Sequence, residues 1–430
     1  MVPHNSERVV DARVDPASNA LLDLGVTYGT PLLVIDEAVL RGAMRRFTRA
    51  FTRDGWTSSV TYAGKALLVR SIARIAHEEG LALDVCSLGE FETALRAGVP
   101  AADCIVHGCL KTAEELDAAV ARRVRHIVVD HRGEIDDLGA RAESAGATVE
   151  VLVRVNPGIA AHTHELVRTG APDSKFGFAI ADGQALDAVD AVVAHSHLRF
   201  AGLHCHIGSQ IIELASYASE IEELLAFARA VHRRNGATCA VIDIGGGLGL
   251  GETTGGITLT PELWADAVFG AFERGLADGE LARPHIYVEP GRALVARAGT
   301  TLYRIGVRKR LPDGCDALIV DGGMSDNPRP ALYAARYNVS VVGREHADPD
   351  GEYTIFGRHC ETDRLVAHVP LPAPQAGDLL AVADTGAYTY SMASNYNRFP
   401  RPAIVIVNEG KARLIAKREP LEHVLDLDVD

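Results

Sequence analysis

Polar residues that could carry out chemistry follow several short apolar runs of this sequence. The C-terminal ends of the strands in a closed parallel barrel meet at one rim, so such residues would gather there if the runs are barrel strands. Each residue alone has an ordinary structural role, as a solvated lysine or a salt-bridged loop does, but their shared position predicts a single site. The candidates are Lys65, Asp84, Ser87, His107, Arg154, His204, His206, Glu289 and Arg292.

A glycine run, Gly245-Gly246-Gly247, follows the apolar stretch AVIDI. Glycines directly after a strand allow backbone N–H groups to turn inward and cradle a phosphate. A tight turn without a ligand is the ordinary alternative. The run does not match the dinucleotide fingerprint, because that pattern needs a helix that opens at once and an acid about 20 residues later.

The segment GLHCHIGSQ contains His204 and His206, which point to the same face if the segment is a strand. Some metal-dependent barrel hydrolases present two metal ligands in this way. No cluster of carboxylates or histidines with suitable spacing accompanies the pair in the sequence. We therefore predict no metal site and keep a metal-dependent hydrolase as an alternative function.

Between residues 60 and 290 the sequence alternates apolar runs with helical stretches. The first intervals are each about 22 residues, the length of one strand, one helix and two short loops. Runs rich in Val and Ile suit a sheet that is buried on both faces. The pattern predicts an α/β protein with a closed (β/α)₈ TIM barrel, and an open doubly wound sheet is the alternative. Strands are expected to begin near residues 60, 81, 104, 126, 149, 200, 240 and 285, with helices within 66–80, 89–98, 113–123 and 134–146.

After about residue 293 the sequence changes to short β-branched segments separated by Gly, Pro and Asp. Such segments are typical of antiparallel strands in an all-β domain, and the segment PLLVIDEA before the barrel could add one more strand to it. We therefore predict a barrel domain over residues 36–292. Residues 1–35 and 293–430 are expected to form a second, all-β domain with the form of a β-sandwich or β-barrel.

The composition argues against several classes of function. A formal charge of −14 disfavours nucleic acid or an anionic membrane as a partner. The first thirty residues contain no apolar core of a secretory signal, and no stretch approaches the roughly 18 to 20 apolar residues of a membrane span. Seven scattered cysteines without a C-x-x-C pair fit reduced thiols better than disulfides or zinc ligands. We expect a cytoplasmic protein.

A series of motifs appears in the order found in one enzyme family. The most specific are HIGSQ within GLHCHIGSQ, EPGR within EPGRALVA, and GAYTYSMASNYN, and IDIGGGLG lies between the first two. In combination they resemble the fold-type III pyridoxal-phosphate decarboxylases, and most closely the diaminopimelate decarboxylase family, from about residue 30 to the end. The other motifs that carry the resemblance are YAGK, LDVCSLGE, HGCLK, RVNPG, HELVRTG, DSKFG, VDGGM, RPALY and CET.

The resemblance implies that pyridoxal 5'-phosphate is the cofactor and that Lys65 carries it as a Schiff base. Burial would lower the pKa of Lys65 and make it a better nucleophile. Glu289 would hydrogen-bond the pyridine nitrogen and keep it protonated, which makes the ring a stronger electron sink; related racemases use an arginine there. His206 would stack on the ring. The implied cofactor-binding residues are Lys65, Asp84, His206, Ser209, Gly246, Gly247, Glu289, Gly291, Arg292 and Tyr388, with Ser209, the glycine run, Gly291 and Arg292 at the phosphate.

The resemblance also implies a homodimer in which each active site is completed across the interface. Cys360 of the partner subunit would be the acid that protonates the carbanion left after CO₂ departs, and Glu361 of the partner subunit would pair with the distal ammonium of the substrate. Arginine suits a distal carboxylate, because its planar guanidinium binds a carboxylate through two hydrogen bonds. The implied substrate-binding residues are Arg292, Arg329, Tyr333, Glu361 and Tyr388.

The implied reaction is the decarboxylation of meso-2,6-diaminopimelate to L-lysine and CO₂, a step of lysine biosynthesis. A decarboxylase of another amino acid is the first alternative. The segment GRHCETDRL is one residue shorter than the family's C-E-S-x-D-x-L form, if Asp363 is the equivalent aspartate. A non-catalytic binding protein on the same fold is a further alternative, and the presence of Lys65, Glu289 and Cys360 counts against it.

Overall fold

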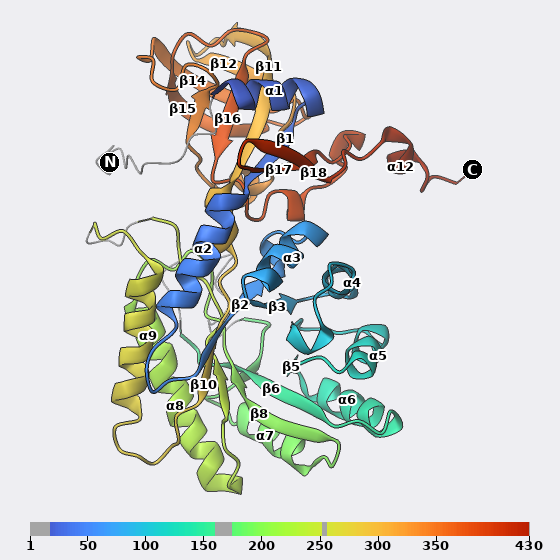
Figure 1. Ribbon diagram of the computed structural model, residues 1–430, viewed down its shortest axis with the longest axis vertical. Coiled ribbons are helices and arrows are strands. Elements are labelled where there is room, and N and C mark those ends of the chain that lie inside the picture. Colours follow the sequence, from blue (N-terminus) through green and yellow to red (C-terminus); the bar gives the residue numbers. More distant parts are fainter. Residues whose placement is uncertain (1–17, 160–173, 252–255, 430) are drawn as a thin grey trace.

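The computed structural model describes residues 18–159, 174–251 and 256–429, which fold around two β-sheets (Figure 1). A barrel occupies the lower part of the view, and a second sheet lies above it beside helix α1 (Ser18–Tyr28). Helix α2 (Glu37–Ala50) runs between them, since it leaves strand β1 (Leu32–Asp36) of the upper sheet and leads into strand β2 (Ser58–Ala63) of the barrel. The two sheets are thus joined at the start of the chain as well as after the barrel.

The lower sheet is a closed barrel of eight parallel strands. Strand β5 pairs with β4 on one side and with β6 on the other, so the barrel has no free edge. This closure confirms the predicted (β/α)₈ barrel and is incompatible with an open doubly wound sheet. The order around the barrel is β5 (His126–Val129), β4 (Cys104–Val106), β3 (Ala82–Val85), β2, β10 (His285–Val288), β9 (Val241–Asp243), β8 (Leu198–His204) and β6 (Val149–Asn156), with the short strand β7 (Phe178–Ala179) paired to the end of β6.

Helices follow the barrel strands and cover their outer faces (Figure 1). Local sequence sets where they begin, because Ser87 and Thr112 accept hydrogen bonds from backbone N–H groups in the first turns of α4 and α5. Ser87, one of the rim candidates, therefore serves as a helix cap. The four predicted helices correspond to the first four of this set. The helices are α3 (Arg70–Glu78), α4 (Leu88–Arg96), α5 (Ala113–Arg122), α6 (Arg132–Ser144), α7 (Gln184–Ala194), α8 (Ala215–Asn235) and α9 (Pro261–Gly275).

The barrel is filled by side chains and packed tightly on its outside. Its centre holds a cluster of buried apolar residues, so it is a core and not a channel. Outside the strands, the fully buried Trp264 of α9 packs against Phe51, which follows α2, and Tyr217 of α8, with ring centroids 5.1 and 5.2 Å away. These contacts hold α8 and α9 beside the end of α2. Among the helices of the described residues, none is both long and apolar enough to cross a membrane.

The upper sheet contains nine strands, and β1 is one of them, as the segment PLLVIDEA predicts. The expectation of purely antiparallel strands is wrong, because β1 runs parallel to β17 and β12 runs parallel to β14. Strand β15 was not predicted; its sequence RLVAHVPL is interrupted by His368 and Pro370, and only Leu365 and Leu371 are buried. Besides β1, the strands are β11 (Gly299–Arg310), β12 (Asp316–Val320), β13 (Val339–Val341), β14 (Gly351–Phe356), β15 (Arg364–Leu371), β16 (Leu379–Ala383), β17 (Ala403–Asn408) and β18 (Lys411–Ala416).

Short helices α10 (Arg292–Val295), α11 (Arg329–Tyr333) and α12 (Leu421–Leu425) accompany these strands. The predicted domain boundaries at residues 36 and 292 stay a prediction. Residues 1–17, assigned to the second domain, and the segment HELVRTG of the family resemblance lie outside the described residues.

Candidate active site

All but two of the predicted cofactor-binding residues line one pocket at the C-terminal end of the barrel. The exceptions are Asp84, which contacts Lys65, and Gly246, which lies behind the pocket wall. The upper region closes this end of the barrel, since the backbone N–H of Tyr388 donates a hydrogen bond to the carbonyl of Ala66 at 2.8 Å. The pocket is lined by Ala63, Lys65, His206, Ser209, Gly247, Leu248, Glu289, Pro290, Gly291, Arg292, Ala293 and Tyr388.

Lys65 lies in a single 3₁₀ turn, Gly64–Ala66, directly after β2. Its Nζ is 3.2 Å from the buried carboxylate of Asp84, at the end of the neighbouring strand β3. Burial lowers the pKa of Lys65, but the negative charge of Asp84 and of other nearby groups outweighs it and raises the pKa well above its usual value. The expectation of a lowered pKa is therefore wrong. Lys65 is a paired cation that must give up a proton before it acts as a nucleophile.

Glu289, at the end of β10, lies between two buried histidines. Its two oxygens are 2.9 Å from Nε2 of His107 and 3.3 Å from Nε2 of His204. Burial alone would raise the pKa of Glu289, but the two imidazoles lower it well below the usual value. Glu289 is therefore an ionised carboxylate in a buried position, which is the form needed to pair with a cationic ligand atom.

The metal-hydrolase alternative relied on His204 and His206 facing one metal ion. In the structure they contact different groups: His204 bonds to Glu289, whereas Nδ1 of His206 accepts a hydrogen bond from the backbone of Gly246 at 3.2 Å. The ligand atoms of His107, His204 and Glu289 do lie within 4.8 Å of one another. His204 is hydrogen-bonded to Glu289 and His107 lies 2.9 Å from its other oxygen, so contacts to one carboxylate account for this grouping.

The glycine run follows β9 and turns across the pocket wall. Asp243 accepts a hydrogen bond from the N–H of Gly245 at 2.8 Å, which fixes the start of the run. A Cβ atom on Gly246 would lie 2.1 Å from the carbonyl oxygen of Glu289, so this position excludes any side chain. Because the N–H of Gly246 is bonded to His206, Gly247 is the member of the run that faces the pocket.

Two arginines and two tyrosines lie close together, and Arg292 and Tyr388 among them line the pocket. The guanidinium groups of Arg292 and Arg329 lie 4.7 and 5.6 Å from the ring centre of Tyr388. Tyr333 faces Arg329 at 5.0 Å. Burial and the charge of Arg329 lower the pKa of Arg292 to about 10. Two neighbouring buried cations favour anionic ligands, as the predicted phosphate and carboxylate contacts require.

The same part of the pocket fits the phosphate group that the sequence implies. Arg292 donates a hydrogen bond to the hydroxyl of Ser209 at 3.1 Å. Its Nε is buried and has no hydrogen-bond partner among the described residues. A buried unpaired donor is costly, and an anionic ligand would satisfy it.

Cys360 and Glu361 lie away from the pocket and are exposed. The backbone N–H of Cys360 donates to the side chain of Asn397 at 3.0 Å, and the hydroxyl of Tyr396 donates to Glu361 at 2.6 Å. Among the described residues that line the pocket, neither is present. One chain therefore does not bring the predicted acid to Lys65.

The shortened segment after Cys360 is anchored by Asp363. This buried carboxylate lies 2.5 Å from Nδ1 of His359 and accepts a hydrogen bond from the N–H of Met324 at 2.8 Å. The ring of His359 stacks on Tyr396. The segment thus reaches the upper sheet although it is one residue shorter than the family form.

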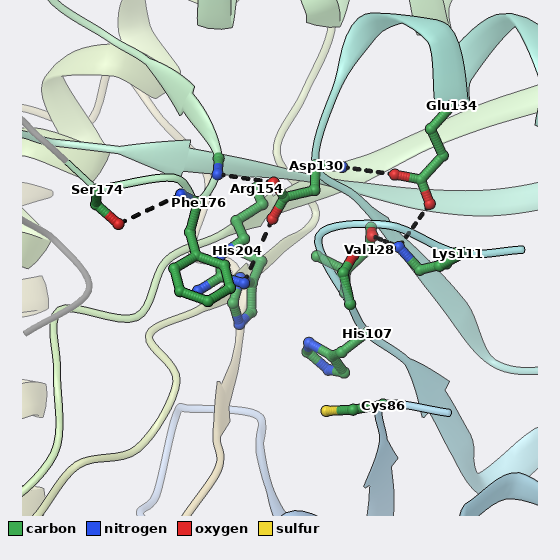
Figure 2. A network of polar contacts seen from close by, with 12 residues as sticks. Cys86, His107, Lys111, Val128, Asp130, Glu134, Arg154, Ser174, Phe176 and His204 are labelled. Carbon is green, nitrogen blue, oxygen red and sulfur yellow. Dashed lines mark hydrogen bonds and ion pairs between the residues drawn. The ribbon is translucent and has the colours of Figure 1, made fainter. Parts of the chain in front are cut away.

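A second polar network lies beside the pocket, at the ends of β4, β5 and β6 (Figure 2). Lys111 is buried and bonds to the carboxylate of Glu134 at 2.5 Å, and Glu134 in turn accepts from the N–H of Asp130 at 2.9 Å. Asp130 accepts from Arg154 at 3.4 Å and from the N–H of Gly177 at 3.0 Å. The network therefore ties the chain after residue 173 to the barrel rim. Arg154, a rim candidate, is part of it and also lies 4.3 Å from the ring centre of Phe176.

Sequence reasoning named His107 and His204 as rim candidates but gave them no role toward the cofactor or substrate, and it did not name Asp243 or Tyr217. His107, His204 and Asp243 lie at the ends of barrel strands and point toward the rim, so their position was the available signal. Tyr217 lies on α8, and nothing in its local sequence indicates contact with the glycine run. The same helix places Glu220 against the thiol of Cys205, next to His206, and burial raises the pKa of Glu220 to about 8.

Comparison with known proteins gives one consistent result. Residues 37–296 match the family model described as "Pyridoxal-dependent decarboxylase, pyridoxal binding domain". The chain is 41% identical over 409 residues to a diaminopimelate decarboxylase of Bacillus subtilis, which covers 95% of this chain and 93% of that protein. It is 42% identical over 438 residues to that of Mycobacterium tuberculosis, which covers 99% and 97%.

Solved structures agree with this result. The diaminopimelate decarboxylase of M. jannaschii, in a complex with L-lysine, has a TM-score of 0.88 at 30% identity and covers 95% of this chain and 94% of its own. The enzyme of Helicobacter pylori, also complexed with L-lysine, has a TM-score of 0.86 at 29% identity and covers 95% and 98%.

Replacement of Glu220 by Gln should change how stability depends on pH. The folded state keeps Glu220 protonated up to a pKa of about 8, whereas the unfolded state ionises near 4.5, so folding takes up a proton between these values. The free energy of unfolding therefore falls as pH rises through this window. In Glu220→Gln this fall should shrink by about 2 kcal/mol or more between pH 5 and pH 8, as measured by urea unfolding. An unchanged slope would contradict the assignment of a buried neutral acid.

Proposed function

The chain belongs to the diaminopimelate decarboxylase family of pyridoxal-dependent decarboxylases, and from this membership we propose that it converts meso-2,6-diaminopimelate to L-lysine and CO₂. As a carboxy-lyase it would act at the D-configured centre of its substrate, in lysine biosynthesis and in the cytoplasm. Its partners would be the amino acid and a second copy of the chain, without nucleic acid or membrane.

One observation carries this proposal. A single pocket joins a lysine paired with an acid, a buried ionised glutamate and an arginine with an unpaired donor. These groups match an amine-reactive aldehyde, a basic ring nitrogen and a phosphate. Pyridoxal 5'-phosphate carries all three on one molecule, and the pocket residues fit it.

Pyridoxal phosphate would supply the aldehyde that bonds to Lys65 and the ring that accepts the electron pair left by CO₂. Asp84, 3.2 Å from Nζ, holds the side chain of Lys65 at the pocket floor and balances its charge. Glu289 would keep a proton on the ring nitrogen. His107 and His204 act through Glu289, because their imidazoles contact its two oxygens and lower its pKa.

The remaining cofactor contacts are assigned from position. Burial and the charge of Lys65 lower the pKa of His206 well below its usual value, so the imidazole is neutral and can stack on an electron-poor ring. Its Nδ1 accepts from Gly246, which leaves the proton on Nε2. Ser209, Gly247, Gly291 and Arg292 would bind the phosphate.

Substrate specificity would come from the arginines around Tyr388. Arg329 is buried between Tyr333 and Tyr388 and is placed to receive a distal carboxylate, with Arg292 beside it. Substrates without a distal carboxylate would leave this buried cation unpaired, which disfavours them. Glu361 of the partner subunit would bind the distal ammonium.

A homodimer would complete the site. Cys360 is exposed on its own chain and is absent from the pocket lining among the described residues. The proton for the carbanion would therefore come from Cys360 of the partner subunit, while Lys65 acts on its own chain.

The primary test measures CO₂ release from meso-diaminopimelate by the cofactor-loaded protein. We expect robust turnover, no turnover of L-lysine or L-ornithine, and loss of turnover in Lys65→Ala. A metal chelator should leave the rate unchanged, which separates this function from a metal-dependent hydrolase. Turnover of another amino acid alone would favour a decarboxylase of different specificity, and normal turnover by Lys65→Ala would refute the assignment of the nucleophile.

Replacement of Arg329 by Ala should raise KM for meso-diaminopimelate by about 10- to 100-fold, because a charge-assisted hydrogen bond contributes about 1.5 to 3 kcal/mol. Steady-state kinetics measures the change. Arg336→Ala is the matched control, since Arg336 is exposed on the same segment and its loss should not alter KM. If the two substitutions changed KM equally, the assignment of Arg329 to the substrate site would be wrong.

A mixture of two inactive variants tests the shared site. Lys65→Ala and Cys360→Ala homodimers should each have little activity. After subunit exchange, half of the dimers are mixed and each contains one intact site, so about a quarter of the wild-type activity should return. If Cys360 served Lys65 of its own chain, no mixed dimer would have an intact site and the mixture would stay inactive.

A further inference from the structure

Tyr217 lies in the first turn of α8 and is fully buried. Its hydroxyl donates a hydrogen bond to the carbonyl oxygen of Gly246 at 3.0 Å. The ring is held in place by Trp264, whose ring centre is 5.2 Å away. The tyrosine therefore reaches the glycine run from behind, on the side away from the pocket.

The orientation of one peptide follows from this bond. In a planar trans peptide the carbonyl and the N–H of the next residue point in opposite directions. Because the carbonyl of Gly246 points to Tyr217, the N–H of Gly247 points away from it, and Gly247 lines the pocket.

The other backbone groups of the run are already bonded. Asp243 accepts from the N–H of Gly245, His206 accepts from the N–H of Gly246, and the carbonyl of Gly247 accepts from the N–H of Ile211 at 2.9 Å. Among the described residues, none accepts a hydrogen bond from the N–H of Gly247. This donor is thus left for a ligand.

Position 247 requires glycine, and the backbone of the glycine run needs an external restraint to hold one conformation. A Cβ atom on Gly247 would lie 2.1 Å from the carbonyl oxygen of Gly208, and φ of Gly247 is +96°. A run of glycines has more conformational freedom than any other sequence, so it loses more entropy when it is ordered. The bond from Tyr217 supplies an external restraint on that freedom.

We propose that Tyr217 is a positioning residue that orients the Gly246–Gly247 peptide so that its N–H binds the phosphate of the cofactor. The inference rests on the proposed function, because it assigns a role toward pyridoxal phosphate. It makes a specific claim: loss of the Tyr217 hydroxyl weakens the phosphate contact and leaves the contacts to the ring intact.

The test compares two ligands on the full-length protein after removal of its cofactor. Pyridoxal 5'-phosphate and pyridoxal, which lacks the phosphate, are titrated and their binding followed by absorbance. In Tyr217→Phe the affinity for pyridoxal phosphate should fall about 3- to 10-fold, the effect of one hydrogen bond. The affinity for pyridoxal should be unchanged. Hydrogen exchange of the peptide that contains Gly245–Gly247 should become faster in the variant.

Tyr353→Phe is the matched control. Tyr353 is also buried and donates from its hydroxyl at 3.0 Å, but to Asp350 in the upper sheet. Both variants are measured at the same interval below their own unfolding temperatures, so a general loss of stability affects both alike. The control should bind both ligands as the wild type does.

Three outcomes would overturn the inference. Unchanged affinity for pyridoxal phosphate in Tyr217→Phe would show that the peptide needs no restraint from the hydroxyl. Equal weakening of both ligands, or the same loss in Tyr353→Phe, would assign Tyr217 a purely structural role. Failure of the wild type to bind pyridoxal phosphate would refute the proposed function itself, and with it the inference.

Discussion

Closure of the parallel barrel is the constraint on which the site depends. The pairing of β5 with β6 removes the last free edge and brings the ends of all eight strands to one rim. Residues from β2, β3, β4, β8 and β10 then meet although they are far apart in the sequence. Lys65 faces Asp84 because β2 and β3 pair in a register that sets Ala63 opposite Asp84. An open sheet would separate its two edge strands, and the histidines would not surround Glu289.

The upper sheet contributes a second set of residues to the pocket that the barrel forms. Strand β1 pairs with both β11 and β17, so segments from the start, middle and end of the chain share one sheet. That sheet carries the loop of Tyr388, and backbone and side-chain bonds from Tyr388 and Ser391 to the carbonyl of Ala66 hold the loop against the turn of Lys65. The arginine cluster is therefore positioned by two sheets at once.

The sequence was sufficient for the barrel strands, because a sheet buried on both faces leaves continuous Val and Ile runs. Strand ends indicated the pocket residues Lys65, His206, Gly247, Glu289 and Arg292, whereas Ser209, Gly291 and Tyr388 were implied by the family resemblance. The sequence failed where the answer depended on contacts between distant segments. The parallel pairs in the upper sheet, the raised pKa of Lys65 and the contact of Tyr217 with Gly246 all follow from tertiary neighbours. The missed strand β15, RLVAHVPL, contains a proline and only two buried side chains, so its sequence shows no regular buried face.

Which buried acid at the barrel rim is ionised depends on its neighbouring groups more than on whether it is Asp or Glu. Asp84, Asp243 and Glu289 are all buried within a small volume, where neighbouring carboxylates oppose each other's ionisation. Glu289 has two imidazoles beside its oxygens and its pKa is lowered, whereas burial and the charge of Glu289 raise the pKa of Asp243 well above its usual value. His107 and His204 thus assign the negative charge to the acid that faces the pocket. Asp243, whose pKa is raised, accepts the hydrogen bond from the N–H of Gly245 and so holds the start of the glycine run.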